Sequence, residues 1–181
     1  MKNIPEKSFY DRDTLTVARE LLGCRLCRKT EKGILSGIIV ETEAYKQDDP
    51  ACHAYKGKTP RAATLFKSPG IAYVYFIYGM YHCFNVITEP EETAGAVLIR
   101  ALEPIEPLKN TNGPGKLCRE LFITKELNEA DLTSPNSGLW IENGVSISKD
   151  NIVQTTRIGI KLASDYPWRF YIKNNRFVSK K

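Results

Sequence analysis

The sequence predicts an α+β fold: one domain with a curved, largely antiparallel β-sheet, flanking helices and a protruding β-hairpin. Three observations lead to this prediction. Runs of β-branched and aromatic residues recur along the chain, short turn signals separate neighbouring runs, and few segments have helical periodicity. The chain of 181 residues has the usual length of one domain, so we expect residues 1–181 to form a single domain.

Three segments are expected to be helical. Residues 11–23 have an apolar face, with Asp11 or Asp13 as the N-cap and a glycine at the end. A Thr-Pro pair supplies the N-cap and first turn of a short helix over residues 59–66. A Gly-Pro-Gly sequence leads into the third helix, over residues 115–122.

The expected strands are rich in β-branched and aromatic residues and are bounded by turn signals. A reversal at Gly79-Met80 joins two of them into a hairpin, and the polar residues 46–58 form a surface loop. The strands are 24–30, 34–45 with an interruption at Gly37, 71–78, 81–88, 96–103 and, with weaker patterns, 138–142, 155–161 and 169–173.

The charge balance and hydropathy narrow the function classes only slightly. There are 26 Lys and Arg against 21 Asp and Glu, which gives a formal charge of +5 and a pI near 8.9. This mild excess suits a polyanion partner but is also common in proteins that bind no nucleic acid. No apolar run approaches membrane-spanning length and the first residues lack an apolar signal region, so we expect a soluble protein.

The cysteines do not predict a disulfide framework or a metal site. Five is an odd number, which favours a reducing compartment. Cys24 and Cys27 form a C-x-x-C, but no second Cys or His pair follows at zinc-like spacing and Cys52-His53 stands alone. We therefore expect ordinary thiols.

Two carboxylates and an aromatic ring are expected on one face of the long strand. With a period of two, Ile39, Glu41, Glu43 and Tyr45 face one way, opposite the residues between them. One interpretation is a surface for acid–base chemistry. The alternative is the solvated outer face of a half-exposed sheet, which this pattern alone favours.

Tyrosines are dense in the predicted hairpin. Tyr73, Tyr75, Tyr78 and Tyr81 lie within nine residues. Tyrosine has high β-propensity, so these can be plain strand residues. They can also form a stacking surface for nucleic acid bases. Tyr78 differs from the others because it lies beside the turn, where a side chain can enter a base stack as a wedge.

These residues belong to an ordered series of motifs that resembles the alkyladenine (3-methyladenine) DNA glycosylase family of the mammalian type. The series covers almost the whole chain, and its order is far more specific than any single motif. The motifs are Val40–Tyr45, His53–Tyr55, Thr59–Arg61, Tyr73–Tyr75, Tyr78–Tyr81, Cys83, Asn85, Val97–Pro104, Gly113–Cys118 and, more loosely, Arg157–Gly159 and Trp168–Tyr171.

The resemblance implies a single DNA glycosylase domain that acts in base excision repair. It implies hydrolysis of the N-glycosidic bond of alkylated, 3-methyladenine-type or otherwise damaged purines flipped out of duplex DNA. The family is metal-free and monofunctional, so no cofactor is expected, and no lysine takes the attacking position. The expected partner is damaged double-stranded DNA, and no membrane association is expected. We expect the protein to act as a monomer inside the cell. It should be found with the chromosome, in the cytoplasm of a bacterium or the nucleus of a eukaryote.

The resemblance also implies the catalytic residues and the pocket. Glu43 is similar to the general base that activates the attacking water, and Arg100 to the side chain that holds this water and a nearby phosphate. Tyr45, His53 and Tyr75 look like the walls of the base pocket. Alkylation at N3 or N7 leaves the purine cationic, so it is a good leaving group and a single base can suffice.

Three further roles concern selectivity and DNA distortion. Asn85, on a strand expected to face Tyr75, resembles the residue that crowds the exocyclic amino group of guanine. Tyr78 resembles the wedge that fills the gap in the duplex, and Met80 borders the flipped nucleotide. A surface including Lys56, Lys58, Arg61 and Arg100 is expected to contact DNA.

Two other functions stay open on the residues alone. A non-catalytic module that stacks bases would explain the tyrosines but would place Glu43 on a phosphate-binding face. A hydrolase of free purine nucleosides would use Glu43 but would not need a wedge at Tyr78. The lesion spectrum is also open among 3-methyladenine, 7-methylguanine, hypoxanthine and ethenoadenine.

Overall fold

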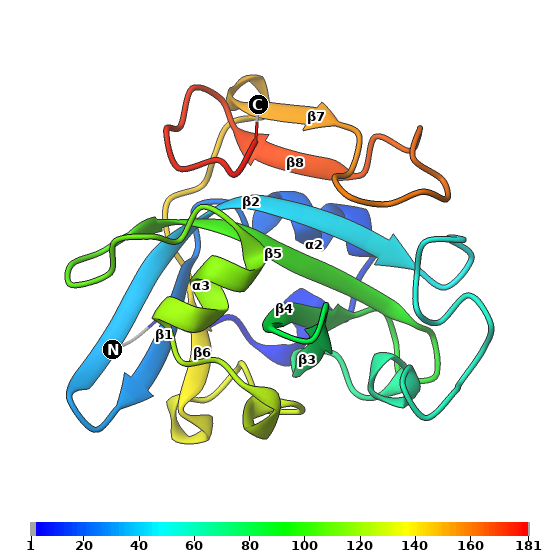
Figure 1. The fold of residues 1–181 in the computed structure, drawn as a ribbon, viewed down its shortest axis with the longest axis horizontal. Helices are drawn as coiled ribbons and strands as arrows, with labels where there is room; N and C mark the ends of the chain where they lie inside the picture. Colours follow the sequence, from blue (N-terminus) through cyan, green and yellow to red (C-terminus); the bar gives the residue numbers. More distant parts are fainter. Residues whose placement is uncertain (1–2, 181) are drawn as a thin grey trace.

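One strongly curled, antiparallel sheet forms the framework of the computed structural model, which describes residues 3–180 (Figure 1). Its main path has the order β3-β4-β5-β2-β1-β6; β8 pairs with β2 beyond the end of β1, and β7 pairs with β8. This confirms the α+β class. The strands are β1 (Arg25–Thr30), β2 (Gly33–Lys46), β3 (Ala72–Ile77), β4 (Tyr81–Thr88), β5 (Gly95–Pro104), β6 (Leu139–Glu142), β7 (Ile152–Thr155) and β8 (Arg169–Ile172).

The long strand β2 is continuous through Gly37, so the predicted interruption there is wrong. The irregularity lies further on, where the β2–β5 register shifts between Ile39 and Glu41 and again before Thr42. A bulge changes which face the following side chains take. Ile39 consequently packs in the same core cluster as Ala44, and it does not share the face of Glu41 and Glu43 as the simple alternation predicted.

Helices are few and short: α1 (Lys7–Tyr10), α2 (Thr14–Glu20) and α3 (Pro114–Glu120). The predicted 11–23 helix is therefore shorter than expected at both ends. Asp13 is its N-cap, because its side chain accepts a hydrogen bond from the backbone N–H of Thr16 at 3.0 Å. The helix ends at Glu20 with Leu21 as its C-cap, and Gly23, in the turn that follows, has a φ of +86°, a conformation that suits glycine.

Two weaker predictions differ from the structure. The segment after Thr59-Pro60 is a turn in which the Thr59 hydroxyl accepts from the Ala62 N–H, and the 3₁₀ helix η1 (Ala63–Phe66) follows in place of the expected helix. The strand predicted over 155–161 is instead β7, which ends at Thr155. The other 3₁₀ helices are η2 (Lys125–Leu127), η3 (Pro135–Ser137) and η4 (Lys149–Asn151).

Two hydrophobic clusters fill the concave sheet. The larger one joins residues of α2 and α3 to the sheet, including Leu21, Leu117 and Phe84, all fully buried. The smaller one packs the 46–71 connection, including Leu65, against Ala96 and other residues of β3, β4 and β5. All five cysteines are buried, and none of them forms a disulfide within residues 3–180. Among residues 3–180, no helix is long and apolar enough to cross a membrane.

Candidate active site

The sheet register places the predicted site residues in one row. Glu43 on β2 pairs with Leu98 on β5, Leu98 pairs with Asn85 on β4, and Asn85 pairs with Tyr73 on β3. Side chains at paired positions of neighbouring strands lie on the same face. The row therefore joins a carboxylate, an amide and a phenol that are far apart in the sequence. The strand that carries Asn85 lies beside the strand of Tyr75, as expected, with Asn85 paired to Tyr73 and Cys83 paired to Tyr75.

The Glu43 carboxylate is fully buried and held by three donors. The Tyr45 hydroxyl donates to its Oε2 at 2.8 Å, and the backbone N–H of Ile158 donates to its Oε1 at 2.7 Å. The Arg100 guanidinium lies 3.3 Å from the same Oε1. Hydrogen bonds and an adjacent cation compensate the burial of a carboxylate. Glu43 is thus held as an oriented acceptor and is not solvated.

Arg100 contacts both carboxylates of β2. Its Nε lies 3.4 Å from Oε1 of Glu41, while its Nη1 lies against Glu43. Glu41 is also fully buried, which contradicts the alternative of a solvated outer face for this part of the strand. Arg100 itself is only 8% exposed, and its Nε makes an ion pair with Glu41 but no hydrogen bond within residues 3–180.

Aromatic side chains form a small pocket beside Glu43. Its volume is about 140 Å³, and Tyr45, His53, Tyr75 and Asn85 all line it, so the structure brings the predicted pocket residues together. The rings of Tyr75 and His53 meet edge to face with centroids 4.7 Å apart. Burial, followed by the charge of Glu43, raises the pKa of Tyr45, so its phenol stays protonated and donates to that carboxylate.

His53 is held in its neutral form. Burial, with a smaller contribution from Arg61, lowers the pKa of His53 to about 4. Its Nδ1 lies 2.9 Å from the Tyr73 hydroxyl, which in turn donates to the Arg61 carbonyl at 3.2 Å. With the phenol proton on that carbonyl, His53 donates through Nδ1 and its Nε2 is left as an acceptor. The loop between Tyr45 and His53 places this ring in the wall of the pocket.

Arg157 and Asp49 support the site, and the sequence patterns assigned a role to neither. Arg157 donates to both carboxylate oxygens of the fully buried Asp49 and to the carbonyl of Ala44. Its guanidinium also lies 4.6 Å from the ring centroid of Tyr45. Burial lowers the pKa of Arg157, but the hydrogen bond and charge of Asp49 outweigh it and raise the value overall. This ion pair fixes the backbone that brings the next N–H, of Ile158, to Glu43.

The β3–β4 hairpin projects its turn residues into solvent. Tyr78 is 78% exposed and Met80 is 64% exposed. Tyr78 has a φ of 54° and Gly79 a φ of 67°, a pair of left-handed residues that makes a tight reversal. A tyrosine in that conformation costs stability and buries little area, and residues of this kind concentrate at functional sites.

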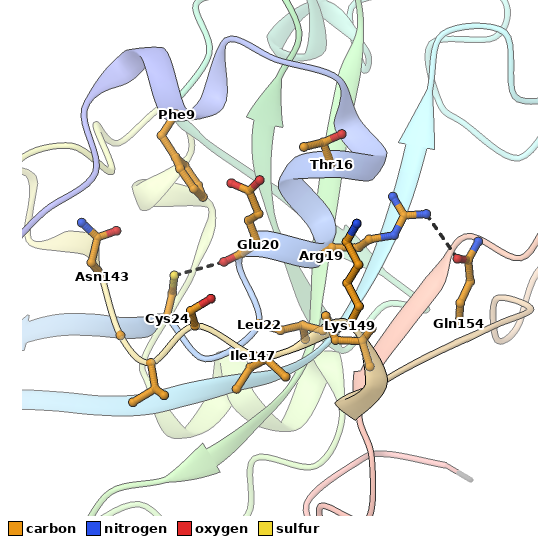
Figure 2. Close-up of a pocket in the computed structure, with 14 residues that line it drawn as sticks. Phe9, Thr16, Arg19, Glu20, Leu22, Cys24, Asn143, Ile147, Lys149 and Gln154 are labelled. Carbon is orange, nitrogen blue, oxygen red and sulfur yellow. Dashed lines mark hydrogen bonds between the residues drawn. The ribbon is translucent and has the colours of Figure 1, made fainter.

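A larger hollow, of about 880 Å³, lies between the N-terminal helices and residues 143–154, away from this pocket (Figure 2). Phe9, Glu20 and Lys149 are among the side chains around it, and the figure shows them on separate elements. None of the predicted site residues lines it. The smaller pocket is the better candidate, because there the buried Glu43 carboxylate, held by Tyr45, adjoins aromatic walls. Within residues 3–180, no group of three or more His, Cys, Asp or Glu side chains could hold a metal ion.

The arrangement can bind a flat, electron-poor ring and activate a small nucleophile beside it. Each oxygen of Glu43 accepts hydrogen bonds in fixed directions and keeps lone-pair capacity for water. The neutral Tyr faces favour a cationic ring. Glu43 can therefore accept a proton beside the aromatic pocket while its carboxylate stays buried.

Comparison with known proteins gives a consistent result. The family model described as Methylpurine-DNA glycosylase (MPG) matches residues 8–176. A protein of Carboxydothermus hydrogenoformans is 50% identical over 97% of this chain and 98% of its own length. A protein of Herpetosiphon aurantiacus is 44% identical over 99% of this chain and 90% of its own length. A protein of Methanoculleus marisnigri is 45% identical over 96% of this chain and 97% of its own length. All three are named "Putative 3-methyladenine DNA glycosylase".

Proposed function

The chain belongs to the methylpurine-DNA glycosylase family, and from this premise we propose how its residues excise a damaged base. The protein is a DNA glycosylase of base excision repair, a hydrolase that removes alkylated bases from DNA. We propose that Glu43 is the general base and water the nucleophile. The observation that supports this role is the buried Glu43 carboxylate, held by Tyr45, Ile158 and Arg100 beside the aromatic pocket.

The proposed reaction uses few protein groups. Glu43 accepts a proton from water as the water oxygen forms a bond to C1′ of the flipped nucleotide. The glycosidic bond breaks, and its electron pair leaves with the purine, which a cationic lesion accepts readily. Arg100 orients Glu43, while Tyr45, His53 and Tyr75 hold the base by stacking. Stacking of about 1–3 kcal/mol per base offsets much of the cost of flipping.

The exposed hairpin tip is proposed to enter the duplex. Tyr78 is the wedge that occupies the space of the flipped nucleotide, and Met80 borders that nucleotide. The enzyme works as a monomer of one domain wherever chromosomal DNA is held. Lys56 and Arg61 are exposed and supply phosphate contacts, whereas Lys58 is bonded to Glu92 at 2.9 Å and the buried Arg100 contributes little.

The two rival functions give different results in one assay. Duplex oligonucleotides carrying 3-methyladenine, 7-methylguanine, hypoxanthine or ethenoadenine are incubated with the protein, beside the matching free nucleosides. We expect release of base from duplex DNA and none from nucleosides. Release from nucleosides at a similar rate would favour a nucleoside hydrolase, and binding without release would favour a stacking module.

A second assay tests water as the nucleophile. An amine nucleophile forms an imine with the sugar, which borohydride reduces to a stable protein–DNA link. None of the residues that line the small pocket is a lysine. We therefore expect no trapped complex and no loss of activity in EDTA. Trapping with borohydride, or complete loss in EDTA, would contradict the water-based proposal.

A further inference from the structure

Glu41 is a fully buried carboxylate for which the proposed reaction has no use. It lies on β2, and its backbone pairs with Ala101 of β5 and Tyr171 of β8. Burying a carboxylate costs free energy unless cations and donors compensate it. The compensating groups therefore indicate what Glu41 does.

Two of these groups are guanidinium ions. Arg100 Nε lies 3.4 Å and Arg169 Nε 3.5 Å from the same oxygen, Oε1 of Glu41. Since Arg100 also contacts Glu43, the cluster alternates in charge from Arg169 to Glu41, Arg100 and Glu43. Two anions and two cations balance inside the protein, and the position of Arg100 depends on both carboxylates.

The third group comes from the segment 173–180, which follows β8 and curls back beside it (Figure 1). The backbone N–H of Ser179 donates to Oε2 of Glu41 at 2.7 Å. The carbonyl of Lys180 accepts from Arg169 at 2.7 Å, and Val178 is only 7% exposed. The segment thus supplies the hydrogen bond to Oε2 of Glu41, whereas Oε1 has no hydrogen-bond partner within residues 3–180 and lies against the two guanidinium groups.

We propose that Glu41 is a positioning residue for the excision reaction, and that segment 173–180 sets its orientation through the Ser179 N–H. Glu41 restrains Arg100 on the side away from Glu43, so Arg100 can hold Glu43 in one orientation. A general base that is displaced slightly loses much of its effect, because proton transfer needs a short and aligned contact. This inference deepens the proposed role of Glu43 and rests on it.

Replacement of Glu41 is a poor first test, because it leaves Arg169 and Arg100 with less compensation and threatens folding. A change at Ser179 is cleaner. Ser179→Pro removes the N–H that Glu41 accepts, since proline has no backbone donor. Ser179→Ala is the matched control: it keeps the N–H and removes only the hydroxyl, which has no hydrogen-bond partner within residues 3–180.

Single-turnover excision from a duplex with one alkylated purine is measured for both variants, together with the Kd for an abasic-site duplex and the urea unfolding midpoint. We expect Ser179→Pro to slow excision about 10- to 100-fold, as small misplacements do. The Kd should stay close to that of Ser179→Ala, which should excise at the normal rate. The unfolding midpoint of Ser179→Pro should fall, because a buried carboxylate loses a donor, so excision is compared at a temperature where the urea curves show both variants to be folded. Equal excision rates for the two variants would overturn the proposal.

A double-mutant cycle tests whether the effect passes through Glu41. In a Glu41→Met background, where no side-chain oxygen can accept the Ser179 N–H, Ser179→Pro should slow excision by less than twofold, because the interaction it removes is already absent. A full additional loss in that background would overturn the proposal, since Ser179 would then act elsewhere. Glu43→Gln, measured in parallel, reports separately on the general base. Full activity of that variant would refute the proposed function and not merely this inference.

Discussion

The buried carboxylate of Asp49 and the guanidinium of Arg157 form a two-pronged ion pair directly behind the ring of Tyr45. Asp49 lies in the loop after β2, and Arg157 lies between β7 and β8, so the pair joins two connections that the sheet alone does not hold together. It places the Ile158 N–H on one oxygen of Glu43 and supports the tyrosine that donates to the other. The stability of this pair and the geometry of the site are therefore linked.

Asp49→Asn should destabilise the protein and slow excision together. Removal of one partner leaves the other charge buried without compensation, which typically costs about 3–5 kcal/mol. The measurement is urea unfolding, with excision assayed at a temperature where the variant remains folded. Asp48→Asn is the control, because Asp48 is exposed and adjacent. Equal stability of the two variants would mean that the ion pair contributes nothing.

The neutral state of His53 predicts a dependence of stability on pH. Its pKa is about 4 in the folded protein against 6.5 as the ordinary value, so the unfolded chain binds a proton more readily. Stability should therefore fall as pH decreases from about 6.5 toward 4. In His53→Gln this part of the decrease should be absent. Thermal unfolding across that range checks it, and identical slopes for both proteins would argue against a buried neutral imidazole.

Asn85 is expected to select against guanine-derived bases. It lines the pocket, and its side chain is fixed by donation to the carbonyl of Tyr73 at 3.1 Å. Only guanine carries the N2 amino group in the minor groove, and a fixed side chain in its path excludes it by repulsion. Asn85→Ser should raise excision of 7-methylguanine relative to 3-methyladenine. An unchanged ratio would remove Asn85 from the selectivity mechanism.

The Tyr78 ring should affect the excision rate on duplex DNA and not the stability of the fold. Because this side chain is 78% exposed, Tyr78→Ala should leave the unfolding midpoint nearly unchanged. It should slow excision from duplex DNA, where a wedge retains the flipped state, much more than excision from a single strand. Tyr78→Phe keeps the ring and should behave like the original protein. Equal losses on both substrates would contradict the role of a wedge.

Much of the sheet could be predicted because its strands follow local rules. The hairpin around Gly79 and the strands at 24–30 and 96–103 have strong β-propensity and clear turns, and they appear as β3–β4, β1 and β5. The residues between Thr155 and Arg169 were harder to predict. Tertiary contacts, chiefly those of Arg157, determine their path.

The candidate site, too, could be predicted only where local patterns determine it. Glu43, Tyr45 and Tyr75 could be placed near one another from strand periodicity together with the family resemblance, and the structure confirms that they are neighbours. The bulge at Ile39–Glu41 could not be predicted from alternation, because it is set by pairing with β5. The partners of Glu41 come from β8 and from Ser179, which are distant in sequence.

The most direct test of the account is the single-turnover excision rate of Glu43→Gln, compared with Glu41→Gln, on a duplex carrying one 3-methyladenine. Glutamine keeps the shape of Glu43 but cannot accept the proton, so we expect a loss of about 10²–10⁴-fold, with tight binding to an abasic-site duplex retained. Glu41→Gln should lose less, because it acts only through Arg100. A Glu43→Gln enzyme that excises at the normal rate, or a greater loss in Glu41→Gln, would contradict Glu43 as the general base.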